Sequence, residues 1–227
     1  NKICVAYNEM DNFFPKEKII LTGNPVRPEI KKLNVDRDIA LRFFNLEADK
    51  KTVLVIGGSL GAYSINTALL KSLLKFDAQK VQFIWQTGIS FSEQAMQYVE
   101  EKNITNCKVF KFIEKMDYAY TVADVIVSRS GAISISELCL VKKPVILVPS
   151  PNVTDDHQKK NALALATKNA ALMIEDENLE NSLYEVVSGL VNDELKQLQL
   201  KTEIAKIGTE NADEDIAKEV INLLNKY

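Results

Sequence analysis

The sequence predicts an α/β fold, in which a doubly wound parallel sheet is covered by helices on both faces. Short apolar runs rich in valine and isoleucine alternate along the chain with longer segments of helical periodicity. Such runs are too short for helices and are typical of strands that are buried on both faces. Regular alternation of strand and helix indicates parallel strands joined by crossover helices.

The elements follow one another in a simple order. The strand-like runs are KICVAY (2–7), TVLVIGG (52–58), VQFIWQTG (81–88), CKVFKFI (107–113), DVIVSR (124–129), PVILVPS (144–150) and AALMIE (170–175). The segments of helical periodicity are 62–76, 90–102, 116–123, 133–142, 156–169, 178–192, 194–207 and 212–226. The last three helices follow one another without a strand, which predicts a helical carboxyl-terminal tail.

Residues 8–33 interrupt this alternation. The segment is irregular and holds three of the six prolines, which disfavour helix interiors and central strands. We interpret it as a connection that enters the main domain, so the run 2–7 is expected to belong to a preceding domain. The chain begins with asparagine rather than methionine, which suggests a piece of a longer protein.

Composition and charge limit the classes of function. The chain has 227 residues, 46% hydrophobic and 26% charged, as is usual for a soluble globular protein. A formal net charge of −3 provides no basic field for nucleic acid. The three cysteines are scattered in apolar surroundings, which indicates buried thiols in a reducing compartment. No run approaches about 18 consecutive apolar residues and no signal-peptide pattern opens the chain, so we expect a cytoplasmic protein.

The loops that follow the strands are the candidate sites, because doubly wound sheets bind ligands beyond the carboxyl ends of their strands. The first loop is GGSLGA (57–62). Its glycines permit a tight turn, and the amides and dipole of the following helix can bind a phosphate. The alternative is an ordinary strand-to-helix turn. Neither GxGxxG nor GK[ST] occurs here, and the next strand ends in Gln86-Thr87-Gly88 without an acid, which argues against nicotinamide and ATP-hydrolysing enzymes.

The second loop is SRSGAISISE (128–137). Ser134 and Glu137 have the spacing of a capping box, in which the Glu137 carboxylate would accept a hydrogen bond from the Ser134 amide at a helix start. The alternative is that this turn faces a ligand, and residue chemistry alone leaves both interpretations open. Neither Ser128 nor Ser130 of this loop has the GxSxG spacing, and His157 is the only histidine, which argues against a serine hydrolase built on this loop.

The third loop is PSPNVTDDHQKKNA (149–162). His157 alone is interpreted as part of a solvated helix start, whereas Gln158 is either a ligand contact or a helix-surface residue. Asp155-Asp156 is the nearest candidate for a metal-binding DxD pair. The three polar loops are expected to meet at one edge of the sheet.

Several motifs together resemble the carboxyl-terminal half of the MurG family. In chain order they are GNPVR (23–27), GGSLGA (57–62), FIEKM (112–116), ADVIVSRSGAISISE (123–137) and the DHQ and NA positions of 149–162. Each motif is weak alone, but the ordered set is specific and covers nearly the whole chain from about residue 2. Members of this family are hexosyltransferases of peptidoglycan synthesis. They move N-acetylglucosamine from UDP-N-acetylglucosamine onto undecaprenyl-diphospho-muramoylpentapeptide, which converts lipid I to lipid II with inversion.

The resemblance implies a GT-B fold, in which two Rossmann-like domains face one cleft. Residues 1–22 would be the end of the amino-terminal domain and the linker, and 23–208 the Rossmann-like domain that binds the donor nucleotide. Residues 209–227 would form a helix that packs toward the amino-terminal domain. Catalytic residues are expected in the amino-terminal half, so the chain alone is expected to bind the donor without turnover.

The resemblance also implies roles for individual residues. Arg27 would approach the donor diphosphate, although a salt bridge at the hinge is its alternative. Ser59 would contact phosphate, and Ile113 would present its backbone N–H and C=O to uracil. Glu137 would accept hydrogen bonds from the ribose hydroxyls, and Gln158 would bind the sugar. The segment expected to wrap the diphosphate and ribose consists of Ala132, Ile133, Ser134, Ile135, Ser136 and Glu137.

The family pattern implies no cofactor and no metal ion. The implied partners are UDP-N-acetylglucosamine, a lipid-linked acceptor bound through the other domain, and the cytoplasmic face of the inner membrane. Two alternatives remain open. One is a sugar-nucleotide epimerase of the same fold, against which the single histidine argues, and the other is a UDP-binding module without catalysis.

Overall fold

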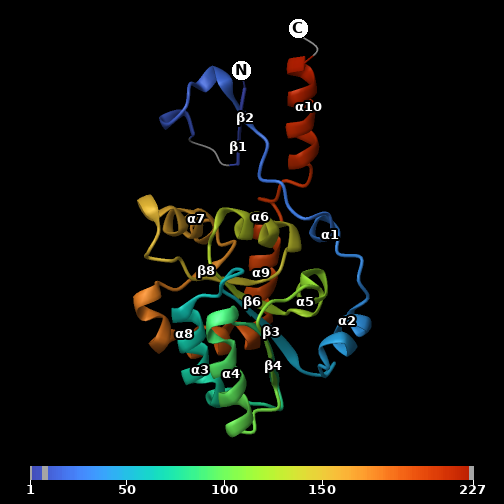
Figure 1. The fold of residues 1–227 in the computed structure, drawn as a ribbon, viewed down its shortest axis with the longest axis vertical. Coiled ribbons are helices and arrows are strands. Elements are labelled where there is room, and N and C mark those ends of the chain that lie inside the picture. The colour runs from blue at the N-terminus through green and yellow to red at the C-terminus, as the bar shows by residue number, and fades with distance from the viewer. Residues whose placement is uncertain (1, 7–9, 225–227) are drawn as a thin grey trace.

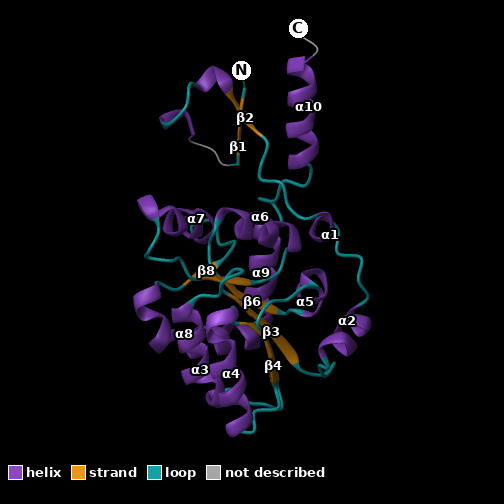
Figure 2. Ribbon diagram, viewed as in Figure 1, coloured by secondary structure: helices purple, strands orange, loops and turns teal. Residues whose placement is uncertain are grey.

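The main body of the protein is built on a parallel six-stranded sheet (Figures 1 and 2). The computed structural model describes residues 2–6 and 10–224, without the side chains of residues 12 and 155. The strand order is β5-β4-β3-β6-β7-β8. The strands are β3 (Lys51–Ile56), β4 (Val81–Gln86), β5 (Cys107–Phe110), β6 (Val125–Ser128), β7 (Val145–Leu147) and β8 (Leu172–Met173). This arrangement confirms the doubly wound α/β fold and every strand that the sequence predicts in this region.

The order of the strands defines where ligands bind in such a sheet. The chain runs outward from β3 through β4 to β5, then returns to place β6 on the other side of β3. The carboxyl ends of the two central strands lie in register, with Ile56 paired to Ser128. The loops that follow β3 and β6 therefore diverge at this point, which is the topological switch point of the sheet.

Helices cover both faces of the sheet, as the alternation of apolar residues along β3 requires. On one face, Leu54 packs in a cluster with residues of α2, α5 and α6, and on the other, Val53 packs with α3, α4 and α8. These helices are α2 (Arg37–Phe44), α3 (Tyr63–Ser72), α4 (Ile89–Glu101), α5 (Met116–Val122), α6 (Ala132–Val141) and α8 (Leu179–Asn192). The remaining helices of the body are α1 (Pro28–Lys31), α7 (His157–Ala166) and α9 (Glu194–Ile204). Short 3-10 turns lie at Met10–Asn12, Lys16–Lys18, Leu73–Lys75, Thr154–Asp156 and Asp176–Asn178.

The amino-terminal segment is more regular than the sequence predicts. Two strands, β1 (Ile3–Val5) and β2 (Ile19–Leu21), form a separate parallel pair. The predicted first strand also included residue 7, which lies outside the described residues. Strand β2, helix α1 and helix α2 were not predicted, because each is too short for its periodicity to stand out. The N-cap residue Asp36 is the one local signal that could have found α2.

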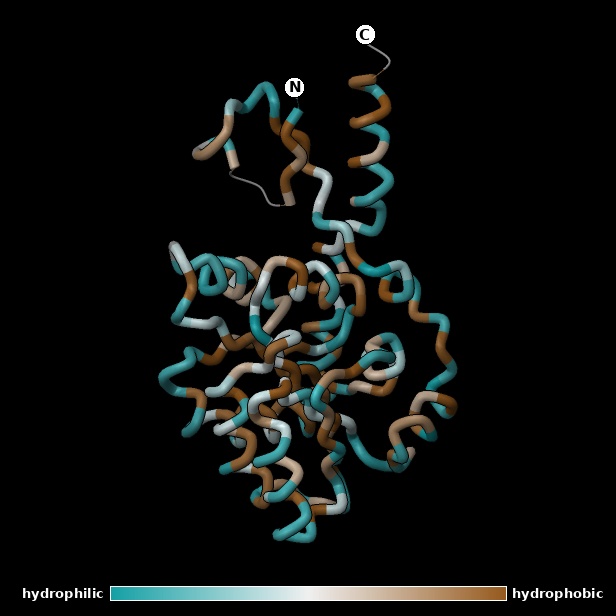
Figure 3. The backbone as a smooth tube through the Cα atoms, in the orientation of Figure 1, coloured by the Kyte–Doolittle hydropathy of each residue, from teal (hydrophilic) through white to brown (hydrophobic). Residues whose placement is uncertain are grey.

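The last helix, α10 (Ala212–Leu224), leaves the main body at the same end as the β1–β2 pair (Figure 1). The two connections touch, since a Cβ atom added to Gly23 would lie 2.9 Å from Cβ of Thr209. A salt bridge joins Lys31 of α1 to Asp213 of α10. Figure 3 shows that hydrophobic residues are concentrated in the strands of the main body and also recur along α10. No helix within the described part of the chain has the length and hydrophobicity needed to cross a membrane.

Candidate functional site

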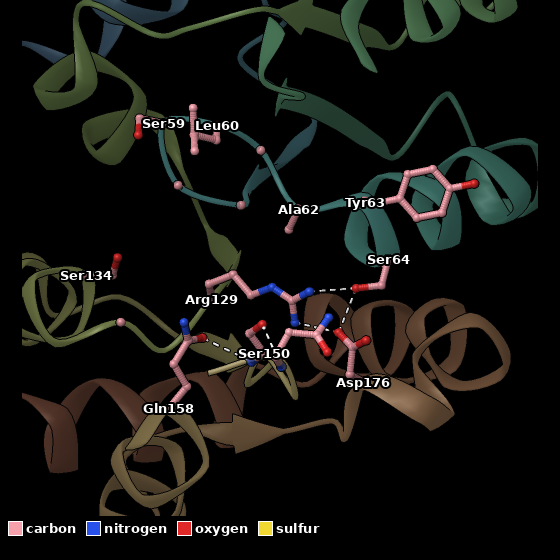
Figure 4. A pocket seen from close by; sticks show the side chains of 15 residues that line it. Ser59, Leu60, Ala62, Tyr63, Ser64, Arg129, Ser134, Ser150, Gln158 and Asp176 are labelled. Atoms are coloured by element: carbon pink, nitrogen blue, oxygen red, sulfur yellow. Dashed lines mark hydrogen bonds and ion pairs between the residues drawn. The ribbon is translucent and has the colours of Figure 1, made fainter. Parts of the chain in front are cut away.

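A cavity of about 600 Å³ lies at the switch point of the sheet. It is formed by the loop after β3, the loop after β6 and the loops after β7 and β8, which meet as the strand order predicts (Figure 4). Among the described residues, the cavity is lined by Gly57, Gly58, Ser59, Leu60, Gly61, Ala62, Tyr63, Ser64, Arg129, Gly131, Ser134, Ser150, Asn152, Gln158 and Asp176.

The glycine loop after β3 forms one wall of this cavity. Gly61 has a φ angle of +80°, a left-handed conformation that favours glycine. A Cβ atom at Gly61 would lie 1.9 Å from the carbonyl oxygen of Thr87, so no side chain fits there. The loop is therefore seated directly against the end of β4, and Ser59 lies at its exposed tip (Figure 4).

Two helices begin at the cavity without a capping side chain. Helix α3 has Ala62 as its N-cap and helix α6 has Gly131, and neither makes a side-chain capping hydrogen bond. Neither helix has an acidic residue in its first turn. Uncapped helix starts present amide donors and the positive end of the helix dipole, which favours an anion in the cavity.

The capping-box alternative for Ser134 and Glu137 is wrong. Helix α6 begins at Ala132, so Ser134 already lies within its first turn and cannot be the N-cap. The Glu137 carboxylate points to other partners, described below. The hydroxyl of Ser134 instead faces the cavity as one of its lining groups (Figure 4).

Arg129 is the cation among the described residues of the cavity wall, and no sequence pattern had singled it out. Its Nη2 donates to Oγ of Ser64 at 2.7 Å, and its Nη1 forms a salt bridge with Asp176 at 2.5 Å (Figure 4). Nη1 also donates to the carbonyl oxygens of Val148 and Pro149, each at 3.1 Å. Arg129 thus ties the ends of β6 and β7 to α3, and Asp176 balances its charge. Its place directly after a central strand was the signal that could have found it.

Arg27 and Glu137 form a bidentate ion pair beside the cavity. Nε and Nη2 of Arg27 each donate to a different carboxylate oxygen of Glu137, both at 2.9 Å. The hydroxyl of Tyr120 donates to the same carboxylate at 3.2 Å. The hydrogen bond to Glu137 raises the pKa of Arg27. Burial, followed by the adjacent Glu137 charge, raises the pKa of Tyr120, so its hydroxyl remains a donor. The hinge salt bridge considered for Arg27 is therefore present.

Gln158 lines the cavity and is held by the loop after β7. Its Oε1 accepts a hydrogen bond from the amide of Ser150 at 3.0 Å, and its backbone carbonyl accepts one from Ser130 at 2.8 Å. Its neighbour His157 is exposed, with Nδ1 2.7 Å from the carbonyl oxygen of Thr154. His157 is thus part of a solvated helix start, as the sequence analysis interprets it. The side chain of Asp155, part of the candidate DxD pair, lies outside the description.

Ile113 is buried, and its backbone amide is already engaged. The amide donates to Oε1 of Gln86 at 2.8 Å, and Nε2 of Gln86 donates to the carbonyl oxygen of Gly58 at 2.8 Å. Gln86 therefore links the loop that contains Ile113 to the glycine loop. A nucleobase that accepts a hydrogen bond from the Ile113 amide has to displace Oε1 of Gln86 or share this donor with it.

The other residues of the predicted binding segment have separate surroundings. Ile133 is 61% exposed, whereas Ile135 is 2% exposed and packs in the hydrophobic core. Ser136 donates to the carbonyl oxygen of Ala132 at 3.0 Å and accepts from Asn24 of the linker at 3.2 Å. The structure thus brings Ser59, Ser134 and Gln158 to the cavity wall, while Arg27 and Glu137 meet beside it.

The fold and this cavity define the class of the protein, a Rossmann-like domain of the GT-B type with its pocket at the switch point. The family model of the glycosyltransferase family 28 C-terminal domain matches residues 52–220, and the chain belongs to this family.

Relatives of known name are transferases of the MurG family, which confirms the resemblance seen in the motifs. The chain is 45% identical over 226 residues to the UDP-N-acetylglucosamine–N-acetylmuramyl-(pentapeptide) pyrophosphoryl-undecaprenol N-acetylglucosamine transferase of Parabacteroides distasonis. That match covers 100% of this chain and 61% of the relative. The enzyme of the same name from Phocaeicola vulgatus is 48% identical over 227 residues, which cover 100% of this chain and 60% of the relative. The chain therefore spans about three fifths of the length of these relatives.

A solved structure supports the same family assignment. The crystal structure of Acinetobacter baumannii MurG superposes with a TM-score of 0.74 at 25% sequence identity. The match covers 100% of this chain and 61% of that structure.

Proposed function

We propose that this chain is the donor-binding domain of an inverting glycosyltransferase that uses UDP-N-acetylglucosamine. The observation that carries the proposal is the cavity between two uncapped helix starts at the switch point of the sheet. Such a cavity suits the diphosphate of a nucleotide sugar, because amide donors and helix dipoles stabilise anions. The relatives named above favour the transferase over the epimerase and over a module without catalysis.

In the complete protein, the reaction would transfer N-acetylglucosamine to undecaprenyl-diphospho-muramoylpentapeptide and convert lipid I to lipid II. The names of the relatives, each longer than this chain, support this acceptor and this role in the bacterial cell wall. Because the proposed acceptor is carried on undecaprenol, a membrane lipid, we propose that the complete protein works at the cytoplasmic face of the inner membrane. The proposed part of this domain is to hold UDP and stabilise it as the leaving group.

We assign residues 23–208 to the donor domain, 1–22 to the end of the amino-terminal domain and its linker, and 209–227 to a helix that packs against that domain. Support comes from α10, in which Ala212 is the one buried residue among those described. Val220, Ile221 and Leu224 are 53%, 54% and 70% exposed, so α10 keeps an apolar surface available for packing. Because these side chains are already partly buried, covering the rest of each one stabilises by less than the about 1.5–3 kcal/mol gained on burying a fully exposed side chain.

Calorimetric titration of the chain with UDP, CDP and UDP-N-acetylglucosamine tests the donor site. We expect UDP and UDP-N-acetylglucosamine to bind. CDP is expected to bind roughly tenfold to a hundredfold more weakly if the carbonyl and amide of Ile113 read uracil, because an unpaired polar group costs about 1–3 kcal/mol. Equal binding of UDP and CDP would remove the base-reading role from Ile113, and absence of UDP binding would refute the proposed function.

A turnover assay with a lipid-linked muramoylpentapeptide acceptor tests the division of labour between the domains. We expect no transfer by this chain alone, because the reaction needs a positioned acceptor and a group that takes its proton. Asp176, the carboxylate of the described cavity wall, is already paired with Arg129. Activity restored by adding a separately produced amino-terminal half would support the proposal, whereas transfer by the chain alone would contradict it.

A further inference from the structure

The Glu137 carboxylate is almost fully engaged by side chains of its own chain. Arg27 occupies both of its oxygens, and the Tyr120 hydroxyl bonds to one of them. A carboxylate accepts about four hydrogen bonds, so three of these positions are filled. The Glu137 side chain is only 8% exposed. The two hydroxyls of a ribose therefore cannot both bond to Glu137 while Arg27 stays in place.

The described lining of the cavity, in turn, holds no unpaired cationic side chain for a diphosphate. Among its described lining residues, Arg129 is the only cationic side chain, and it is paired with Asp176. Arg27 is better placed to supply charge, because its side chain is 39% exposed and it stands at the start of α1, next to the linker.

The distance from Glu137, where Arg27 is bound, to the start of α6 at the cavity is short. Ser134 lines the cavity, and Glu137 lies three residues further along α6. Residues three apart share one face of a helix and are separated by slightly less than one turn, roughly 4.5 Å along the axis. A guanidinium released from Glu137 needs to move by about this distance to reach an anion at the start of α6.

We propose that the Arg27–Glu137 pair is a latch that the donor opens, with the ribose replacing Arg27 on Glu137 and Arg27 moving to the diphosphate. Tyr120 keeps its bond to Glu137 throughout and is a positioning residue, since it holds the carboxylate after Arg27 has left. This inference rests on the proposed function and adds a coupling between the ribose and diphosphate subsites. A nucleoside must break the ion pair without compensation, whereas a nucleoside diphosphate recovers the charge of Arg27.

The latch predicts opposite effects of one substitution on two ligands. In Arg27→Met, the ion pair is lost while the side chain keeps a similar length. We expect uridine to bind at least threefold more tightly than to the unaltered chain, because nothing competes for Glu137. We expect UDP to bind at least tenfold more weakly, because the diphosphate loses its cation. Calorimetry measures UDP, and nuclear magnetic resonance titration measures the weaker uridine.

Arg37→Met is the matched control. Arg37 has a similar exposure of 38% and is also paired with an acid, Asp124, but it lies at the start of α2 away from the cavity. It should change the affinity for neither ligand. Arg27→Lys is the second variant, because lysine keeps the charge but cannot form the bidentate pair. We expect it to bind uridine more tightly than the unaltered chain and to retain most of the UDP affinity.

The outcomes of these titrations distinguish failure of the latch from failure of the proposed function on which it rests. If the unaltered chain fails to bind UDP, the proposed function and the latch both fail. If it binds UDP but Arg27→Met and Arg27→Lys bind uridine no more tightly, the latch alone is overturned. Should Arg27→Met fail to fold, Arg27→Lys decides the question by the same uridine measurement.

Discussion

Two kinds of helix start occur in this molecule. Helices α2 and α9 begin with an aspartate that caps its own helix. Asp36 accepts hydrogen bonds from the amides of Asp38 and Ile39 at 2.9 and 3.1 Å, and Asp193 accepts one from Lys196 at 2.9 Å. Helices α3 and α6, which begin at the cavity, have no side-chain cap.

Helices α4, α5, α7 and α8 also lack a side-chain cap, so a missing cap alone does not mark a ligand site. What sets α3 and α6 apart is that their uncapped starts line the cavity. A cap from aspartate is worth about 1 kcal/mol relative to alanine, the N-cap of α3, and only about a few tenths of a kcal/mol relative to glycine, the N-cap of α6. An aspartate at either position would also place a negative charge where a diphosphate is proposed to bind. The four predictions that follow test this contrast, from the largest expected effect to the smallest.

Gly61→Ala should be the most damaging change at the uncapped starts. Its Cβ would meet the Thr87 carbonyl at 1.9 Å, and alanine is strained at a φ of +80°. We expect the free energy of unfolding to fall by about 3 kcal/mol and UDP binding to be lost, because the glycine loop must move away from the end of β4. Urea denaturation and calorimetry measure the two effects.

Two other glycines serve as controls for Gly61. Gly58 has a φ of +87° but open space around its Cβ position, so Gly58→Ala should cost only about 1 kcal/mol. Gly189 lies inside α8 with open space and no positive φ, so Gly189→Ala should stabilise by up to about 1 kcal/mol. Equal losses at all three positions would show that packing against Thr87 does not determine the loop.

Gly131→Asp converts the uncapped start of α6 into a capped one. The backbone of Gly131 suits any residue, with φ −63° and ψ 151°, and its added Cβ would meet only Oγ of Ser134 at 3.7 Å. We expect stability to rise by about 0.5–1 kcal/mol and UDP affinity to fall by about 1–2 kcal/mol, roughly tenfold. Gly131→Ser is the neutral control, with a cap but little loss of affinity. Unchanged UDP affinity in Gly131→Asp would argue against an anion at this helix start.

Glu137→Gln tests whether the acid of α6 serves a ligand, now that its capping role is excluded. Replacement of the charged acceptor should weaken UDP binding by about 1–2 kcal/mol if the ribose hydroxyls bond to it. The substitution should also reduce the preference for UDP over 2′-deoxy-UDP. Titration of both proteins with both ligands measures this preference. The same preference in both proteins would leave Glu137 only its bonds to Arg27 and Tyr120.

Asp36→Ala provides the reference from a capped helix. Loss of the bonds to Asp38 and Ile39 should lower the free energy of unfolding by about 1 kcal/mol. UDP affinity should stay unchanged, because α2 begins away from the cavity. A change in UDP affinity comparable to that of Gly131→Asp would show that cap chemistry affects binding through overall stability.

The sequence by itself was enough for the parallel sheet and for the edge at which the cavity lies. Both follow from local patterns, since alternating apolar runs report burial and strand-ending glycine loops report the carboxyl edge. The motifs were also enough for the family. The sequence did not predict the shortest elements. The three residues of β2, for example, are too few to show a periodic pattern.

Only the tertiary structure decided how the polar residues of the site are paired. Arg27 and Glu137 are 110 positions apart, and no local pattern reports that the linker returns to α6. The capping-box spacing was misleading for the same reason, since the true helix start depends on how the loop after β6 packs. The hydrogen-bond partners of a buried carboxylate are the donors that the fold brings close to it. The spacing of residues along the chain carries no information about these long-range contacts.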